Sequence, residues 1–365
     1  MGRSFGAHNG GVEEDCVNGA FMSTPLRVGI IGLGARCTIA ENCQLSSVPA
    51  ELVGGCDPNP AMRERARAIL GDHPWVESLE ELLDLGIDAA IVTSPDDTHE
   101  DITCQLLEAG VGVYLEKPIA ITIEGADRVL ETAFRTKTPL YVGHNMRHMA
   151  VVRILRQVIH DGLIGEVRAI WCRHFVGNGG DYYFKDWHAD RSRTTGLLLQ
   201  KAAHDIDVMN WLSDSVPERV VGMGDLMVYG KLTDRSGQRR DSVMSDWFSY
   251  ENWPPESLTG LNPVIDVEDL SMFMMRQVSG TMISYEQCHF TPDYWRNYTV
   301  IGTRGRVENF GDGDGGVVRV WKHRSRWEPQ GDIEIPIRGD ARGHDDADVA
   351  TMDEFLRFVA RGDQT

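Results

Sequence analysis

The sequence LRVGIIGLGARC, residues 26–37, decides the fold of this chain. It begins with an apolar run of strand length and leads into a helical stretch that ends at Leu45. Gly32 and Gly34 stand where the first pattern changes to the second. In a strand–turn–helix unit the first glycine makes the tight turn, and the second lets a phosphate group approach the backbone at the helix start. The stretch therefore predicts a phosphate-binding turn.

A carboxylate follows this turn at the spacing that a dinucleotide site requires. Residues 51–57 predict a second strand, which ends in Asp57. A carboxylate roughly 20 residues beyond the glycines can hold the hydroxyls of a ribose. We therefore expect a dinucleotide site made of Gly32, Gly34, Ala35, Arg36 and Asp57. Cys37 stands where a third glycine or an alanine is usual, so an ordinary turn with a solvated aspartate remains the alternative.

Asp57 also bears on which dinucleotide the site accepts. Its negative charge would repel the 2′-phosphate of NADP, and Pro58 and Asn59 offer no cation to bind one. NAD is therefore the expected cofactor. Arg63 and Arg65 on the next predicted helix keep NADP open as the alternative.

The first part of the chain alternates strands with helices. Apolar runs predict strands at 26–33, 51–57, 88–93, 112–115 and 139–142. Helical spacing predicts helices between them at 61–70, 77–85, 98–109 and 123–136. This alternation is typical of a parallel sheet that is covered on both faces. We therefore predict a Rossmann dinucleotide-binding domain over residues 25–147, preceded by a flexible tail at 1–24.

The remaining residues, 148–365, are expected to form a second domain of α+β type. Helices are predicted at 150–161, 196–212 and 348–360. Strands are predicted at 166–176, 219–229, 268–277, 280–289, 298–302, 317–321 and 333–337. The turn signals between neighbouring runs predict an open, mostly antiparallel sheet, and residues 232–263 predict a long loop. The whole chain is therefore of α/β class, with the second domain serving substrate binding and oligomerisation.

Composition excludes several classes of partner. The chain carries 55 acidic and 36 basic residues, a net charge of -19, without a dense basic cluster. Such a field repels nucleic acid and anionic membranes. No apolar run approaches the ~20 residues that span a bilayer, and the first residues lack the pattern of a secretory signal. The 7 cysteines form no C-x-x-C pair, which predicts reduced thiols in a cytoplasmic protein without a metal site.

Two further segments stand at the predicted carboxyl ends of parallel strands, where ligands bind in sheets of this kind. Ser94-Pro95, with His99, follows the third strand, and Glu116-Lys117-Pro118 follows the fourth. We expect Ser94, Pro95, His99 and Glu116 to contact the cofactor, and Lys117 to reach both the cofactor and the substrate.

The register of strand, Glu-Lys-Pro and helix resembles the glucose–fructose oxidoreductase, inositol dehydrogenase and rhizopine-catabolism (Gfo/Idh/MocA) family. Residues 196–207, GLLLQKAAHDID, resemble the family pattern G-x-L-x-D-x-G-x-H-x-x-D, with Trp211-Leu212 downstream. His204 and Asp207 match, whereas Gln200 and Ala202 replace the usual Asp and Gly. The resemblance implies hydride transfer between NAD and a secondary hydroxyl of a sugar, polyol or cyclitol, in a homodimer or homotetramer.

The resemblance also assigns roles to individual residues. His204 would take the hydroxyl proton, and Lys117 would stabilise the developing alkoxide or relay its proton. Gln200 can hold a hydroxyl but cannot accept a proton as a base, so more of the base role passes to His204. A hydrogen-bonded helix histidine and a solvated loop lysine are the alternatives. Lys201 is expected to point elsewhere on the helix and to pair with Asp205.

Substrate contacts are expected from two places besides the helix that carries Gln200 and His204. Arg147 lies where the chain enters the second domain, and residues 181–188 offer the aromatic and polar groups that bind sugar rings: Tyr183, Trp187 and His188. A packed surface loop is the alternative for these residues. Residues 294–296 precede a predicted strand and serve either the substrate or the sheet, and His289 is expected to be structural.

Two other functions remain open. Some relatives are glycosidases that oxidise their substrate transiently with bound NAD, and others are non-catalytic NAD-binding sensors.

The alternating apolar residues of 270–275 and 282–285 would suit either a subunit interface or an ordinary helix-backed core.

Overall fold

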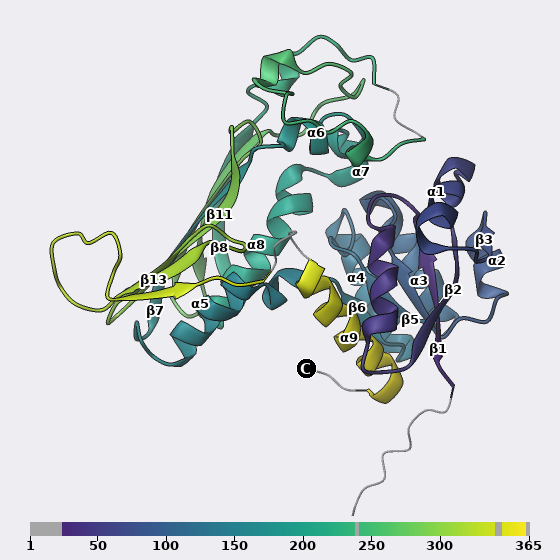
Figure 1. Ribbon diagram of the computed structural model, residues 1–365, viewed down its shortest axis with the longest axis horizontal. Helices are drawn as coiled ribbons and strands as arrows, with labels where there is room; N and C mark the ends of the chain where they lie inside the picture. Colours follow the sequence, from purple (N-terminus) through teal and green to yellow (C-terminus); the bar gives the residue numbers. More distant parts are fainter. Residues whose placement is uncertain (1–23, 238–240, 340–344, 363–365) are drawn as a thin grey trace, which may run out of the picture.

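The computed structural model describes residues 24–237, 241–339 and 345–362, which form two parts joined side by side (Figure 1). The predicted tail at 1–24 lies outside the described residues up to residue 23. Each part is built around one sheet, and helix α8 (Leu197–Ser213) lies on the side of the second sheet that faces the first part. This arrangement confirms the predicted α/β class.

The first sheet is entirely parallel, in the order β3-β2-β1-β4-β5-β6. Its strands are β1 (Leu26–Ile31), β2 (Ala50–Cys56), β3 (Trp75–Val76), β4 (Ala89–Val92), β5 (Gly112–Leu115) and β6 (Leu140–Val142). Every residue of β4 and β5 is buried, because helices cover both faces of the sheet. The carboxyl ends of these strands meet at one edge, where the predicted cofactor residues stand.

The helices of the first part divide between the two faces of this sheet. Helices α2 (Leu79–Leu83), α3 (His99–Glu108) and α4 (Ile123–Thr136) cover one face, and α1 (Pro60–Leu70) and η1 (Cys37–Leu45) cover the other. The segment after the glycine turn was predicted as an ordinary helix, but η1 is a 3₁₀ helix. It has no side-chain cap, and the β-branched Thr38 and Ile39 in its first turn disfavour the α form.

The second sheet has the order β14-β13-β12-β11-β7-β10-β9-β8 and is antiparallel except for the pair β7 and β10. Its strands are β7 (Val167–Val176), β8 (Pro217–Asp225), β9 (Leu270–Gln277), β10 (Met282–Cys288), β11 (Tyr294–Gly302), β12 (Arg306–Phe310), β13 (Val317–Trp321) and β14 (Ile333–Pro336). Its inner face packs on α5 (Ala150–His160) and α8. Because β11 starts at Tyr294, residues 294–296 belong to the sheet rather than preceding it.

The last helix, α9 (Asp345–Arg361), returns to the first part of the chain (Figure 1). Met352, Phe355 and Leu356 are buried in the same core as β1. The helix therefore packs on the first sheet, although it lies in the segment 148–365. The division of the chain at residue 147 stays a prediction.

Residues 177–269 include a layer of short helices and turns above one end of the second sheet. It contains α6 (Gly179–Tyr183), η4 (Trp187–Ala189), α7 (Arg191–Thr194), η5 (Tyr229–Lys231), η6 (Met244–Asp246) and η7 (Pro255–Ser257). The predicted loop 232–263 thus holds two short 3₁₀ turns, and its residues 238–240 lie outside the described part. Two buried carboxylates organise this layer. Asp269 accepts the backbone N–H groups of residues 227, 228 and 229.

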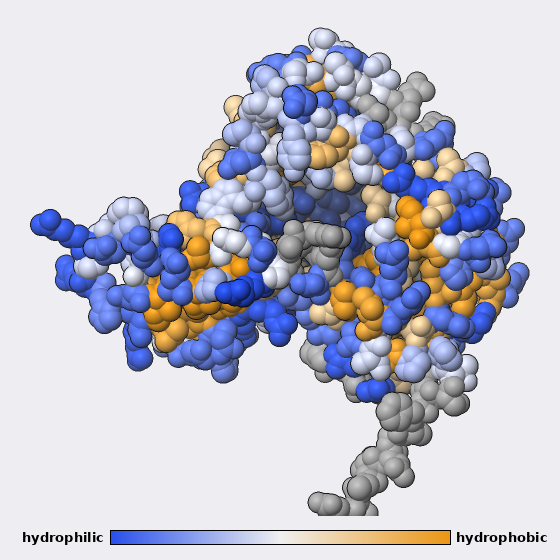
Figure 2. Space-filling model, in the orientation of Figure 1, coloured by the Kyte–Doolittle hydropathy of each residue, from blue (hydrophilic) through white to orange (hydrophobic). Residues whose placement is uncertain are grey.

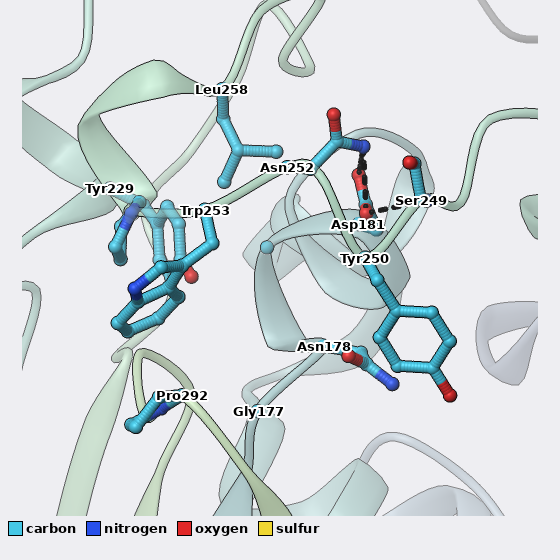
Figure 3. A pocket seen from close by; sticks show the side chains of 12 residues that line it. Gly177, Asn178, Asp181, Tyr229, Ser249, Tyr250, Asn252, Trp253, Leu258 and Pro292 are labelled. Carbon is cyan, nitrogen blue, oxygen red and sulfur yellow. Dashed lines mark hydrogen bonds between the residues drawn. The ribbon is translucent and has the colours of Figure 1, made fainter.

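The second of these carboxylates, Asp181, lines a small pocket in this layer (Figure 3). It accepts hydrogen bonds from the Asn252 amide and the Ser249 N–H group and pairs with Lys185 at 2.5 Å. These contacts fix α6, which carries Tyr183.

Of the seven cysteines, Cys37, Cys43, Cys56, Cys104 and Cys172 are buried free thiols. Among the described residues, no helix combines the length and apolarity needed to cross a bilayer.

Candidate active site

The glycine turn after β1 has the geometry of a phosphate cradle. Gly32 has a φ of +88°, and a Cβ atom there would lie 2.5 Å from the backbone nitrogen of Ser94, so only glycine fits. A Cβ atom on Gly34 would meet no protein atom within 4 Å. The backbone at Gly34 is therefore open on the side where a ligand can approach, and Ala35 beside it is exposed. The turn fits a dinucleotide pyrophosphate.

Asp57 is held against this turn. One carboxylate oxygen accepts the N–H group of Leu33 at 2.9 Å, and the other accepts that of Asn59 at 2.8 Å. Arg63 donates to the backbone oxygen of Asp57 at 2.6 Å, whereas Arg65 turns away to Asp246. Asp57, the residue predicted to bind the ribose, thus lies next to the glycine turn, and Arg63 contacts its backbone oxygen.

Arg36 connects three segments at the edge of the first sheet. Its guanidinium donates to Glu116 at 2.6 Å and to Asp348 of α9 at 2.8 Å. Burial alone would lower the pKa of Arg36, but these two carboxylates raise it well above its usual value. Arg36 and Glu116, both predicted to contact the cofactor, therefore engage each other. Their contact with a cofactor stays a prediction.

His99 ties two strand ends together. Its side chain is buried, with Nδ1 2.7 Å from the carbonyl oxygen of Pro118 and Nε2 2.9 Å from that of Ser94. These contacts join the Ser94-Pro95 turn after β4 to the Glu-Lys-Pro turn after β5. His99 thereby positions both turns, and their contact with the cofactor stays a prediction.

Lys117 reaches across from the first part to the second. Its ammonium donates to the backbone oxygen of Gln200 in α8 at 2.9 Å. Burial lowers the pKa of Lys117, an effect that the carboxylates of Asp96 and Glu116 oppose. Gln200 and His204 are 7% and 5% exposed and lie one helical turn apart. The structure thus brings Lys117 to the helix that carries the other two predicted catalytic residues.

His144 belongs to the same neighbourhood, and the sequence analysis did not single it out. It follows β6, as Lys117 follows β5, and its ring centroid lies 6.4 Å from that of His204. Burial lowers its pKa, and the positive charges of Arg147 and Lys117 add to this effect. The signal that could have found it is its place after a parallel strand, at the edge where the other candidates stand.

The entry to α8 is anchored on the first part of the chain. Thr194 donates to the buried Asp96 at 3.1 Å, and Arg193 pairs with Asp97 at 3.1 Å. Thr195 donates to the backbone oxygen of Ile121. These contacts lie beside the Lys117–Gln200 bond, so they fix the position of α8 over the strand ends.

The aromatic residues predicted to bind substrate, Tyr183, Trp187 and His188, contact one another near this site. The ring of Tyr183 makes edge contacts with His188 and His289, both at 5.3 Å between centroids. Trp187 stacks on His188 at 3.7 Å. Burial raises the pKa of Tyr183, while the positive charge of Lys117 lowers it, which places the tyrosine near that lysine.

Arg147 makes a different contact from the one predicted. Its guanidinium binds both carboxylate oxygens of Asp207, at 2.7 and 2.6 Å. This pair joins the end of the first part to α8, and Asp207 is the residue that matches the last position of the family pattern. A direct contact between Arg147 and substrate stays a prediction.

The prediction that Lys201 pairs with Asp205 is wrong. Asp205 is fully buried against the second sheet, where it pairs with Arg296 at 3.1 Å and His174 at 3.2 Å and accepts a bond from Tyr285. Because these groups already occupy the carboxylate, the flexible lysine extends elsewhere. The Nζ atom of Lys201 lies 5.5 Å from the centre of the Tyr183 ring, and its positive charge lowers the pKa of Lys117.

Figure 2 shows a hollow with a largely polar lining between the two parts. Lys117 and Gln200 meet where these parts come together. The site thus combines an open glycine turn, a carboxylate beside it, a lysine that bridges the two parts, and two neighbouring histidines. Among the described residues, no group of three His, Cys, Asp or Glu side chains is placed to hold a metal ion.

Two family models match the chain. Residues 26–144 match an oxidoreductase family with an NAD-binding Rossmann fold, and residues 152–308 match the GFO/IDH/MocA C-terminal domain. The YteT protein of Bacillus subtilis is 28% identical over 61% of this chain and 60% of its own length. An inositol 2-dehydrogenase of Rhizobium meliloti is 28% identical over 60% of this chain and 64% of its own length. The chain thus spans less than two thirds of these relatives.

A solved structure has the same fold over nearly the whole chain. A levoglucosan dehydrogenase, in complex with NADH and levoglucosan, superposes with a TM-score of 0.75 at 17% identity, covering 94% of this chain and 92% of the other. The structure-wide likeness and the two matched models agree with the residues that carried the resemblance. The chain belongs to the GFO/IDH/MocA oxidoreductase family.

Proposed function

We propose that the protein is an NAD-dependent dehydrogenase that oxidises a secondary hydroxyl of a sugar, polyol or cyclitol. The observation that carries the proposal is the 2.9 Å bond from Lys117 to Gln200. It places an ammonium group from the cofactor-binding part on the helix that bears His204. Relatives in the same family include inositol 2-dehydrogenase and glucose-6-phosphate 3-dehydrogenase, which supports this reaction class.

Each residue of the site has its own role in the proposed reaction. The Gly32–Gly34 turn would hold the pyrophosphate of NAD, and Asp57 the ribose hydroxyls. A bound nicotinamide supplies the acceptor for the hydride. As the C–H bond of the substrate breaks and its C–O bond becomes C=O, His204 takes the hydroxyl proton and Lys117 stabilises the negative charge on oxygen. Gln200 holds a neighbouring hydroxyl.

Three features of the site support NAD over NADP. Both carboxylate oxygens of Asp57 are already held by backbone N–H groups, which keeps its charge next to the ribose position. Arg63 binds the backbone rather than offering its guanidinium to a 2′-phosphate, and Arg65 faces Asp246.

We also propose that the protein is cytoplasmic, since buried free thiols suit a reducing compartment. We further propose that it forms a homodimer or homotetramer.

The test is NADH formation, followed by absorbance, across cyclitols, aldoses and glycosides with NAD or NADP. The proposal requires NADH to accumulate with at least one substrate. Lys117→Met removes the ammonium while keeping the length of the side chain. We expect it to lower kcat by about 10²–10³-fold, while NADH binding, measured by fluorescence, weakens much less.

Lys322→Met, on an exposed loop, serves as the matched control and should leave kcat unchanged. Release of reducing sugar from glycosides without net NADH would instead indicate a glycosidase. Equal kcat values for the wild type and Lys117→Met would contradict the assigned role.

A further inference from the structure

Two lysine side chains from different elements lie in the neighbourhood of the candidate site. Lys117 comes from the turn after β5, and Lys201 comes from α8 and lies over Tyr183. Both residues are intermediate in exposure, between buried and exposed. Burial lowers the pKa of each lysine, and the charge of Lys201 lowers that of Lys117 further. Two like charges therefore stand close enough to oppose each other.

Neither lysine has a carboxylate within 4.0 Å of its nitrogen in the part of the chain that the structure describes. The carboxylates that face them are engaged elsewhere. Asp205 is paired with Arg296 and His174, and Asp312 accepts the backbone N–H of Arg296 at 3.1 Å. This leaves Lys201 without a direct counter-charge on the side of the second sheet.

The same holds on the side of the first sheet. Glu116 accepts the guanidinium of Arg36 at 2.6 Å, and Asp96 accepts the hydroxyl of Thr194 at 3.1 Å. These carboxylates attract Lys117 at a distance but do not contact it. A partly buried ammonium without a paired anion is costly, and a ligand that brings an anion would relieve that cost.

A second observation points to a ligand at the same place. The side-chain oxygen of Gln200 is buried, and it has no hydrogen-bond partner among the described residues. Buried polar atoms normally find a partner, so this oxygen is free to accept from a bound molecule. Gln200 lies directly before Lys201 and its backbone oxygen holds Lys117. The unsatisfied acceptor therefore lies in the residue that Lys117 contacts and that precedes Lys201 in α8.

We propose that the substrate is an anionic sugar, whose carboxylate or phosphate group is bound by Lys201 while Lys117 and Gln200 hold its hydroxyls. This inference rests on the proposed dehydrogenase function. The oxidised nicotinamide would add a further positive charge at this place, so an anionic substrate also compensates the charge of the cofactor. A neutral polyol would leave both ammonium groups without a directly contacting anion.

The experiment compares acids with their neutral counterparts. NADH formation is measured with D-glucuronate against D-glucose and D-glucuronate methyl ester, with D-galacturonate against D-galactose, and with D-glucose 6-phosphate. We expect kcat/KM for at least one anionic sugar to exceed that of its neutral counterpart by about tenfold or more, the size of one charge-assisted hydrogen bond. The phosphate arm separates the two sources of negative charge.

Variants at position 201 test where the anion binds. Lys201→Met should reduce this preference by about tenfold, mostly through KM, whereas Lys201→Arg should retain it. Lys322→Met, on an exposed loop, should leave the preference unchanged. A preference that survives in Lys201→Met would overturn the proposal, as would a wild-type protein that uses neutral sugars at least as well as every acid.

A second measurement does not depend on turnover. The melting temperature of the NADH-bound protein is recorded with each acid and with its neutral counterpart. We expect a larger rise with the acid in the wild type, and loss of the difference in Lys201→Met. If no substrate is oxidised, the proposed function fails while this shift still decides whether the site binds anions. Equal shifts with acids and neutral sugars would refute the inference.

Discussion

His174 is fully buried, and its lowered pKa is expected to make the stability of the protein depend on pH. Burial and the neighbouring charge of Arg296 lower its pKa from 6.5 to about 3. The unfolded chain keeps the ordinary pKa, so on acidification it takes up a proton that the folded chain refuses. This contribution to stability is therefore fully present above pH 6.5 and is lost progressively as the pH falls toward 3. Its slope is about 1.4 kcal/mol per pH unit.

Urea unfolding at pH 7 and pH 5 measures this dependence. We expect the wild type to lose about 2 kcal/mol more between these values than His174→Gln, which has no proton to take up. His323→Gln, on an exposed loop, should behave as the wild type does. Parallel pH profiles for the wild type and His174→Gln would show that His174 is protonated in the folded protein.

The structure brings Lys117 to the helix of Gln200 and His204, residues that short motifs singled out, whereas side-chain directions were harder to predict. The Lys117 and His204 predictions rested on registers that fix backbone position. For Lys201, the helical spacing placed Asp205 on the same face, but Arg296 from β11 had already taken that carboxylate. His144 escaped notice because nothing in its sequence surroundings marks it apart from its place at a strand end.

Helix α9 is held to the first sheet by polar contacts as well as by its apolar face. Arg36 contacts Glu116 and Asp348, whose side chains are 11% and 9% exposed. Arg36→Met would leave two nearly buried carboxylates without their cation. Because Arg36 itself is 38% exposed, solvent screens part of the loss, and we expect a cost of about 1–3 kcal/mol in the free energy of unfolding.

Denaturant unfolding of Arg36→Met gives this value, and hydrogen exchange over residues 345–361 should show faster local opening of α9. The control is Arg319→Met, which removes the exposed ion pair with Glu334 and should cost at most about 1 kcal/mol. A cost for Arg36→Met no larger than that of the control would mean that the apolar face of α9 alone holds the helix.

At the scale of elements, the apolar runs predicted every strand of the first sheet except β3, which has two residues. The strand β12 was missed, because its two apolar residues, Val307 and Phe310, are three positions apart and its second inward position is the buried polar Asn309. Helix α9 was predicted as a helix, but its partner could not be read from its own sequence. Amphipathic spacing says that one face is buried and leaves open which surface covers it.

At the scale of the whole molecule, the outer face of the second sheet exposes apolar side chains in a single chain. Apolar side chains gather over this part of the surface (Figure 2). Along β8, β9 and β10 the exposed residues form cross-strand neighbours, with Met223 opposite Met272 and Val221 opposite Met274. Met223 is 81% exposed and Met274 is 60% exposed. A contiguous apolar patch of this kind marks a protein interface.

We expect the protein to form a homodimer or homotetramer through this face, so light scattering after gel filtration should give two or four times the chain mass of 40.7 kDa. Met274→Glu places a charge in the middle of the patch and should shift the protein toward the monomer, because burying an unpaired carboxylate opposes association. Leu130→Glu, at an equally exposed position on α4, should leave the mass unchanged. A monomeric wild type, or a Met274→Glu protein with the wild-type mass, would place the subunit contact elsewhere or remove it.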